Sequence, residues 1–168
     1  MLPDETKAEV LRWALATLEE TTKALKLYTD YEVQATEEYL AEEHADDEET
    51  AYSLQDHRLC VFLVNLLNFQ HSIVAAVLRE LGQADKLDKH FLLRGDLAGL
   101  EKPPENPPKA ESTAKERHTW MLERKLRHLH LQSVACSQWL DDIDRLRRDL
   151  RLSPTGGYPL PFDEIPST

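Results

Sequence analysis

Apolar residues recur at every third or fourth position along three long stretches of the chain, and this spacing predicts α-helices. Proline and two acids at positions 3–5 favour a helix N-terminus there. No glycine or proline follows before position 50, so one long helix is expected, either continuous through Ala35 and Tyr39 or broken near Thr29 and Asp30. The predicted buried stripe of this helix comprises Leu11, Ala14, Leu15, Leu18, Thr22, Leu25 and Tyr28.

Two further long helices are predicted downstream. One runs from about Ala51 to Leu81, with Gly82 as its C-terminal cap. Its middle is apolar nearly all round, which is typical of the central element of a bundle. The last begins at Thr113, because residues 113–116 (TAKE) have the form of a capping box. Its predicted stripe comprises Leu122, Leu126, Leu129, Ser133, Cys136, Leu140, Ile143 and Leu150.

The connecting segments have a different composition. Residues 83–94 predict a short helix that ends at Gly95, and residues 102–109 hold four prolines, which predict an extended loop. Residues 153–168 alternate prolines and glycines with apolar side chains, so a tail is expected that either folds back or docks on a partner as an extended peptide.

Together these elements predict an all-α protein. At 168 residues the chain fits one domain, expected over residues 1–152 with the Pro-rich loop inside it, followed by the tail. Long helices pack along one another, so the expected architecture is an elongated bundle of three long helices plus one short helix. Rods of this length commonly keep apolar surface for a second copy, and a homodimer is expected.

The net charge of −11 is concentrated in the first third of the chain. Residues 1–56 hold 16 acidic and 4 basic side chains, and eight of the acids fall within residues 37–49. Residues 111–151 carry a small positive excess, so the first and last long helices are expected to be neighbours with complementary charge. A chain of this charge repels phosphate backbones, which makes nucleic-acid binding unlikely and favours a basic protein partner.

The apolar segment at residues 60–78 is long enough to span a membrane. It contains Asn65, Asn68, Gln70, His71 and Ser72, however, which favour a helix of a soluble core. No secretory signal is recognised at the N-terminus, and we expect a cytoplasmic protein with no membrane contact. Cys60 and Cys136 lie in apolar runs and are expected to be buried thiols.

The chain lacks the spacings of most catalytic and metal sites. It has no Glu-x-x-His pair, no His-Glu-x-x-His and no Cys-x-x-Cys, and no metal or cofactor is expected. The acids at residues 37–49 precede an apolar helix, an arrangement that is similar to that of MazG-type pyrophosphatases. In that helix, however, Asn65 and Asn68 stand where the family needs carboxylates. Five glycines, of which two are adjacent, leave no phosphate-binding loop.

One motif suggests chemistry. Arg124 and His130 are separated by five residues, a spacing that resembles the Arg-x(4–6)-His element of HEPN-type ribonucleases. The resemblance covers about seven residues and implies that Arg124 stabilises a phosphate while His130 assists attack by a ribose hydroxyl. Lys125 follows the arginine, where that family commonly has a polar Asn, Asp or His.

The leading functional hypothesis is a non-enzymatic interaction protein, such as an adaptor, inhibitor or small subunit. It would act through an acidic helical face and the tail, and the HEPN-like ribonuclease is the alternative. The expected binding residues combine acids with aromatic anchors, which are typical of interfaces: Glu42, Glu43, Asp46, Asp47, Glu48, Trp120, Tyr158 and Phe162.

Overall fold

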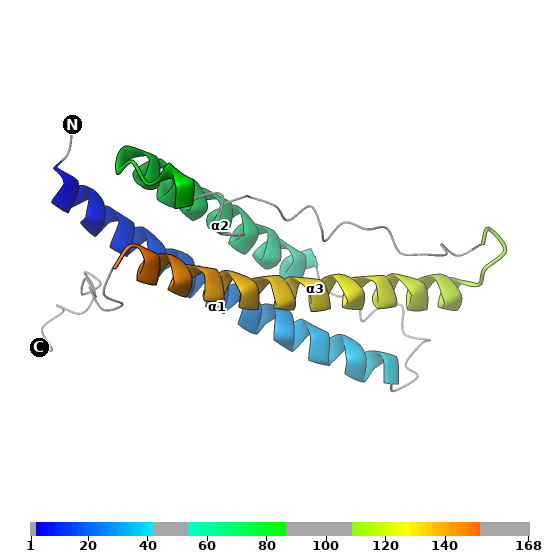
Figure 1. Ribbon diagram of the computed structural model, residues 1–168. Coiled ribbons are helices and arrows are strands. Elements are labelled where there is room, and N and C mark those ends of the chain that lie inside the picture. Colours follow the sequence, from blue (N-terminus) through cyan, green and yellow to red (C-terminus); the bar gives the residue numbers. More distant parts are fainter. Residues whose placement is uncertain (1–2, 42–53, 87–108, 152–168) are drawn as a thin grey trace, which may run out of the picture.

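Three long α-helices make up most of the residues that the computed structural model describes, which are 3–41, 54–86 and 109–151 (Figure 1). α1 spans Asp4–Ala41, α2 Leu54–Glu80 and α3 Ala114–Asp149, and a 3-10 turn, η1, spans Ala84–Lys86. These ranges contain no strand, so the all-α class is confirmed. The predicted Pro-rich loop, the tail and most of the predicted short helix lie outside the described residues.

α1 is the central helix of the bundle, because it packs along both α2 and α3. In Figure 1, α2 and α3 both run antiparallel to α1. The C-terminal end of α2 lies beside the first turns of α1, whereas α3 ends beside a point farther along α1. The prediction that the apolar α2 would be central is therefore wrong. Its surplus of apolar residues forms an exposed face, on which Phe62 and Phe69 are 60% and 64% exposed.

The buried positions of α1 follow a heptad pattern, with spacings of four and three residues in alternation. This pattern keeps one seam of a helix facing its partners over many turns. α1 continues without a break through Thr29, so the continuous alternative is the correct one. The seam consists of Leu11, Leu15, Leu18, Thr22, Leu25, Thr29, Glu32 and Thr36.

The seam changes character along α1. It is mainly leucine up to Leu25, where it meets the apolar parts of α2 and α3 to form the hydrophobic core. Beyond Leu25 the seam is polar, but the buried threonine hydroxyls on it are hydrogen-bonded. Thr22, Thr29 and Thr36 each donate to the carbonyl oxygen four residues earlier, at 2.7 Å.

The buried stripe of α3 differs in part from its prediction. Cys136 and Ile143 are buried as expected, whereas the predicted Leu126 and Leu140 are only half-buried. Polar Gln132 occupies the seam because it has a hydrogen-bonding partner on α1. A pattern restricted to apolar residues therefore misses part of the stripe, whose buried members are Leu122, Leu129, Gln132, Ala135, Cys136, Trp139, Asp142, Ile143 and Leu146.

Local hydrogen bonds fix the helix ends. At the start of α3, Glu116 N–H donates to Thr113 Oγ1 at 3.2 Å and Thr113 N–H donates to the Glu116 carboxylate at 2.7 Å, which confirms the capping box. At the end of α2, Gly82 has a φ of 69°, the left-handed conformation that glycine adopts freely. The buried Lys7 of α1 then donates to the Glu80 carbonyl at 3.2 Å, so it caps the C-terminus of α2.

Because α1 holds both neighbours, shortening a core leucine on its seam should destabilise the whole bundle. Leu18 is fully buried, and Leu18→Ala is expected to lower the free energy of unfolding by about 3 kcal/mol through lost burial and a cavity. Urea unfolding followed by circular dichroism measures this. Leu27→Ala on the same helix, at a side chain 74% exposed, is the matched control and should change stability by less than about 0.5 kcal/mol.

Candidate functional site

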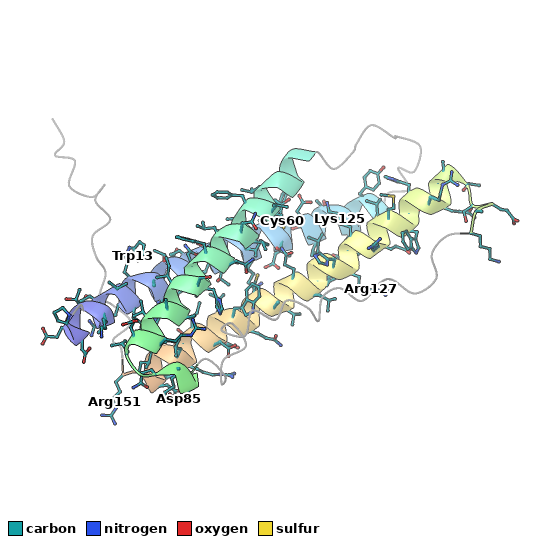
Figure 2. The ribbon with its side chains drawn as sticks, turned by 90° about the horizontal axis from the view of Figure 1, so that it is seen from above. Trp13, Cys60, Asp85, Lys125, Arg127 and Arg151 are labelled. Carbon is teal, nitrogen blue, oxygen red and sulfur yellow. The ribbon has the colours of Figure 1, made fainter. Side chains whose placement is uncertain are left out.

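Buried polar groups cluster where the second half of α1 crosses α3. Glu32 on the α1 seam accepts a hydrogen bond from Lys125 Nζ at 2.8 Å, and the two side chains are 6% and 31% exposed. In Figure 2, Lys125 lies on the side of α3 that faces α1. A carboxylate buried to this degree needs a paired cation, since its burial alone costs several kcal/mol. This ion pair therefore fixes the register of α3 against α1.

A second polar layer lies one turn earlier on α1. Gln132 Nε2 on α3 donates to Thr29 Oγ1 at 2.7 Å, and Thr29 in turn donates to the Leu25 carbonyl. The Cys60 thiol of α2 lies 3.9 Å from Gln132 Oε1, so one layer connects all three helices. Buried amide and hydroxyl groups are tolerated here because each has a partner.

The predicted complementarity between α1 and α3 is seen as ion pairs outside the core. Arg147 of α3 contacts Glu19 at 2.5 Å, and the neutral Ser133 adds a hydrogen bond to Asp30 at 2.5 Å. Burial would raise the pKa of the Glu19 carboxyl, but hydrogen bonds from Lys23 and Arg147 outweigh it and lower this pKa. The same balance holds for Asp30. Burial would raise the pKa of its carboxyl, but hydrogen bonds from Lys26 and Ser133 outweigh burial and lower this pKa.

The two cysteines are free thiols in different surroundings. Cys136 is fully buried, and burial raises the pKa of its thiol to about 12, so it is an unreactive core residue. Cys60 is half-buried beside Gln132. The expectation of a buried thiol therefore holds fully for Cys136 and in part for Cys60.

Arg124 and His130 do not share a site within one chain. Six residues along a helix separate two side chains by about 9 Å along the axis and 120° around it. Arg124 is exposed and lies over the Trp120 ring, 5.7 Å from its centroid. His130 is 53% exposed and faces α1, with Nε2 3.3 Å from Glu37 Oε1.

The remaining predicted binding residues lie outside the described residues, except for Trp120. These are the acids Glu42, Glu43, Asp46, Asp47 and Glu48 and the tail residues Tyr158 and Phe162. The described ranges contain no cluster of three or more His, Cys, Asp or Glu side chains that could hold a metal ion. Trp120 is half-buried, and Met121 beside it is 62% exposed.

Comparison with known proteins adds no function. No protein-family model, curated protein or solved structure matches the chain.

One helix segment, Leu59–Glu80, is long and apolar enough to cross a membrane by length and composition alone. A third of that window is buried inside the bundle, where Leu67, Val74 and Leu78 face the core. In Figure 2, α2 lies in front of α1 and α3, so the outer face of α2 is turned toward the viewer. This outer face carries Phe62 and Phe69.

The polar groups between α1 and α3 were not predicted as a cluster from the sequence. Continuing the heptad spacing of Leu18, Thr22 and Leu25 by four and three residues leads to Thr29, Glu32 and Thr36. That spacing is the available signal, but the predicted stripe ends at Tyr28 and does not include these polar side chains.

Removing Lys125 should leave the buried Glu32 carboxylate without its principal cation. Lys125→Ala is expected to lower the free energy of unfolding by about 2 kcal/mol, below the cost for a fully buried pair because Lys125 is partly exposed. Replacing both partners, Glu32→Leu with Lys125→Leu, should restore most of this loss. Urea unfolding of the three proteins checks the order, and a double variant less stable than Lys125→Ala would contradict it.

The lowered pKa values of Glu19 and Asp30 make the bundle sensitive to acid. A carboxyl with a lowered pKa in the folded state stabilises the fold above its unfolded pKa of about 4, and this stabilisation is lost as the pH falls through the folded value. Asp30→Asn should therefore lower the free energy of unfolding at pH 7 and flatten its decline between pH 5 and 2. Denaturant unfolding over this range measures the effect, with the exposed Glu5→Gln as control.

Proposed function

We propose that the chain is a non-enzymatic protein-interaction module, an adaptor, inhibitor or small subunit that binds a basic protein partner. It acts through an acidic surface at the C-terminal end of α1, together with the tail. The observation that carries the proposal is the position of the acidic side chains at the C-terminal end of α1. Glu37 and Glu38 are exposed in the last turns of α1, where no basic side chain accompanies them in the final turn.

The helix dipole does not favour acids at that position, although Glu38 accepts a hydrogen bond from Gln34 and Glu37 lies beside His130. The C-terminus of an α-helix carries a partial negative charge, so carboxylates there are unfavourable by a few tenths of a kcal/mol each. The chain nevertheless continues from Ala41 directly into the acidic residues 42–49. A charge concentration that opposes local stability is expected to serve binding, by steering a basic partner toward this end.

Apolar anchors lie at the same end of the bundle. The ring of Tyr39 contacts His118 edge-on, with centroids 6.1 Å apart, and this places the last turn of α1 beside the first turns of α3. Trp120 and the exposed Met121 lie within one turn of His118. Interfaces combine aromatic or methionine anchors with a polar rim, and this end supplies both.

The proposal is tested with a variant in which Glu42, Glu43, Asp46, Asp47 and Glu48 become Gln or Asn. A photo-reactive residue at position 38 of the natural chain captures a neighbour in cells, and the captured protein is then purified and titrated. The acid variant should bind it at least tenfold more weakly, with a smaller dependence on salt. Neutralising Asp4, Glu5 and Glu9 at the other end of α1 is the matched control.

Equal affinity of the acid variant and the natural chain would contradict the proposal. The ribonuclease alternative is tested with the same proteins by incubating them with single-stranded RNA. RNA cleavage by the natural chain that is lost in His130→Ala would replace the interaction proposal with the enzyme. We expect no cleavage, and partner binding by His130→Ala equal to that of the natural chain.

A further inference from the structure

α2 carries a second heptad seam on the face turned away from α1. Its positions are spaced by three and four residues in alternation, as on the buried side of the helix, and they are Leu59, Phe62, Leu66, Phe69, Ile73 and Ala76. The buried positions Leu67, Val74 and Leu78 point to the core. The second seam lies outside this core-facing side and is exposed or half-buried along its whole length, and the half-buried Ile73 also packs against the edge of the core.

The regular spacing indicates that another helix covers this seam. A helix partner requires apolar knobs every 3.5 residues on average, and a pattern sustained over five intervals matches that period. Scattered exposed apolar residues are ordinary on protein surfaces, but a contiguous stripe with two phenylalanines marks an interaction site.

Charge distinguishes this face from the rest of the molecule. Residues 59–78 contain no Asp, Glu, Lys or Arg, in a chain of net charge −11. Two copies of so acidic a chain repel each other over most of their surface. They meet without that repulsion along α2, where the exposed flanking residues Asn65, Asn68 and Ser72 are neutral and polar.

We propose that this seam binds the same seam of a second copy, with the two α2 helices antiparallel. The apolar positions are arranged so that reversal of the helix maps the seam onto itself. With the two-fold axis between positions 66 and 69, position 62 of one copy is level with position 73 of the other, and position 59 with position 76. A two-fold pairing of this kind is closed, so it ends at a dimer. The inference is independent of the proposed basic partner, which binds elsewhere.

The exposed area fits a moderate dimer. A phenylalanine offers about 200 Å² in total, so Phe62 and Phe69 each leave roughly 120 Å² on this face. With the other seam residues, two copies would bury on the order of 1,000 Å², at the lower end for specific interfaces. The dimer should therefore dissociate on dilution.

Sedimentation equilibrium of the full chain between about 5 and 500 µM is the first measurement. The average mass should rise from 19.4 kDa toward twice that value, with little dependence on salt because the seam is uncharged. Phe62→Ser with Phe69→Ser should weaken the association at least tenfold. Leu27→Ser with Tyr31→Ser, at positions 74% and 68% exposed on α1, is the matched control and should leave it unchanged.

The register is tested with two exposed positions. Leu59→Lys and Ala76→Glu should each weaken self-association, and an equimolar mixture should form a mixed dimer, because these positions face each other only in the antiparallel arrangement. Circular dichroism confirms that every variant is folded. A mixture that stays as weakly associated as either variant alone overturns the antiparallel register.

Three outcomes would overturn the dimer itself. One is a mass of 19.4 kDa at every concentration with no binding to vesicles, which would favour another part of the same chain as the cover of the seam. Another is a dimer that Phe62→Ser with Phe69→Ser does not weaken. The third is a monomer that binds vesicles of phosphatidylcholine and phosphatidylglycerol through this face, which would assign the seam to a membrane.

Discussion

The buried seam of α1 is the constraint on which the other two helices depend. It runs from Leu11 to Thr36 without a break in its heptad spacing, and both α2 and α3 pack against it. α2 and α3 make far fewer contacts with each other, so neither has a second principal support among the described residues. A substitution that weakens packing on this seam therefore destabilises both α2 and α3, whereas a substitution on the outer face of α2 or α3 affects only that helix.

The first half of the seam supplies hydrophobic burial, and the second half determines the register of the helices. Leucines in its first half supply non-directional hydrophobic burial, which permits several registers. The second half uses directional groups, with Gln132 bound to Thr29 and Lys125 bound to Glu32. A shift of α3 by one turn would leave Gln132 and Glu32 buried without these partners, at a cost of a few kcal/mol. The polar half of the seam thus selects one of the registers that the leucine half permits.

Much of the fold could be predicted from the spacing of apolar residues. The three long helices, the Thr113 capping box and the Gly82 cap were all predictable, because each depends on local sequence. The central position of α1 was not, because apolarity alone favoured α2. The cluster around Glu32 was missed because pairing across helices decides whether a carboxylate can be buried. For the candidate site, Trp120, Arg124 and His130 could be named as candidates, but only the structure shows that Arg124 stacks on Trp120 while His130 faces Glu37.

α1 is thus the helix on which the packing of both α2 and α3 depends. Native-state hydrogen exchange followed by mass spectrometry tests this claim most directly, because amide protection reports the free energy of local opening. We expect the amides from Leu11 to Thr36 of α1 to exchange only through global unfolding, while those of α2 open at lower free energy. Amides of α2 that are better protected than those of α1 in the dilute monomer would contradict it.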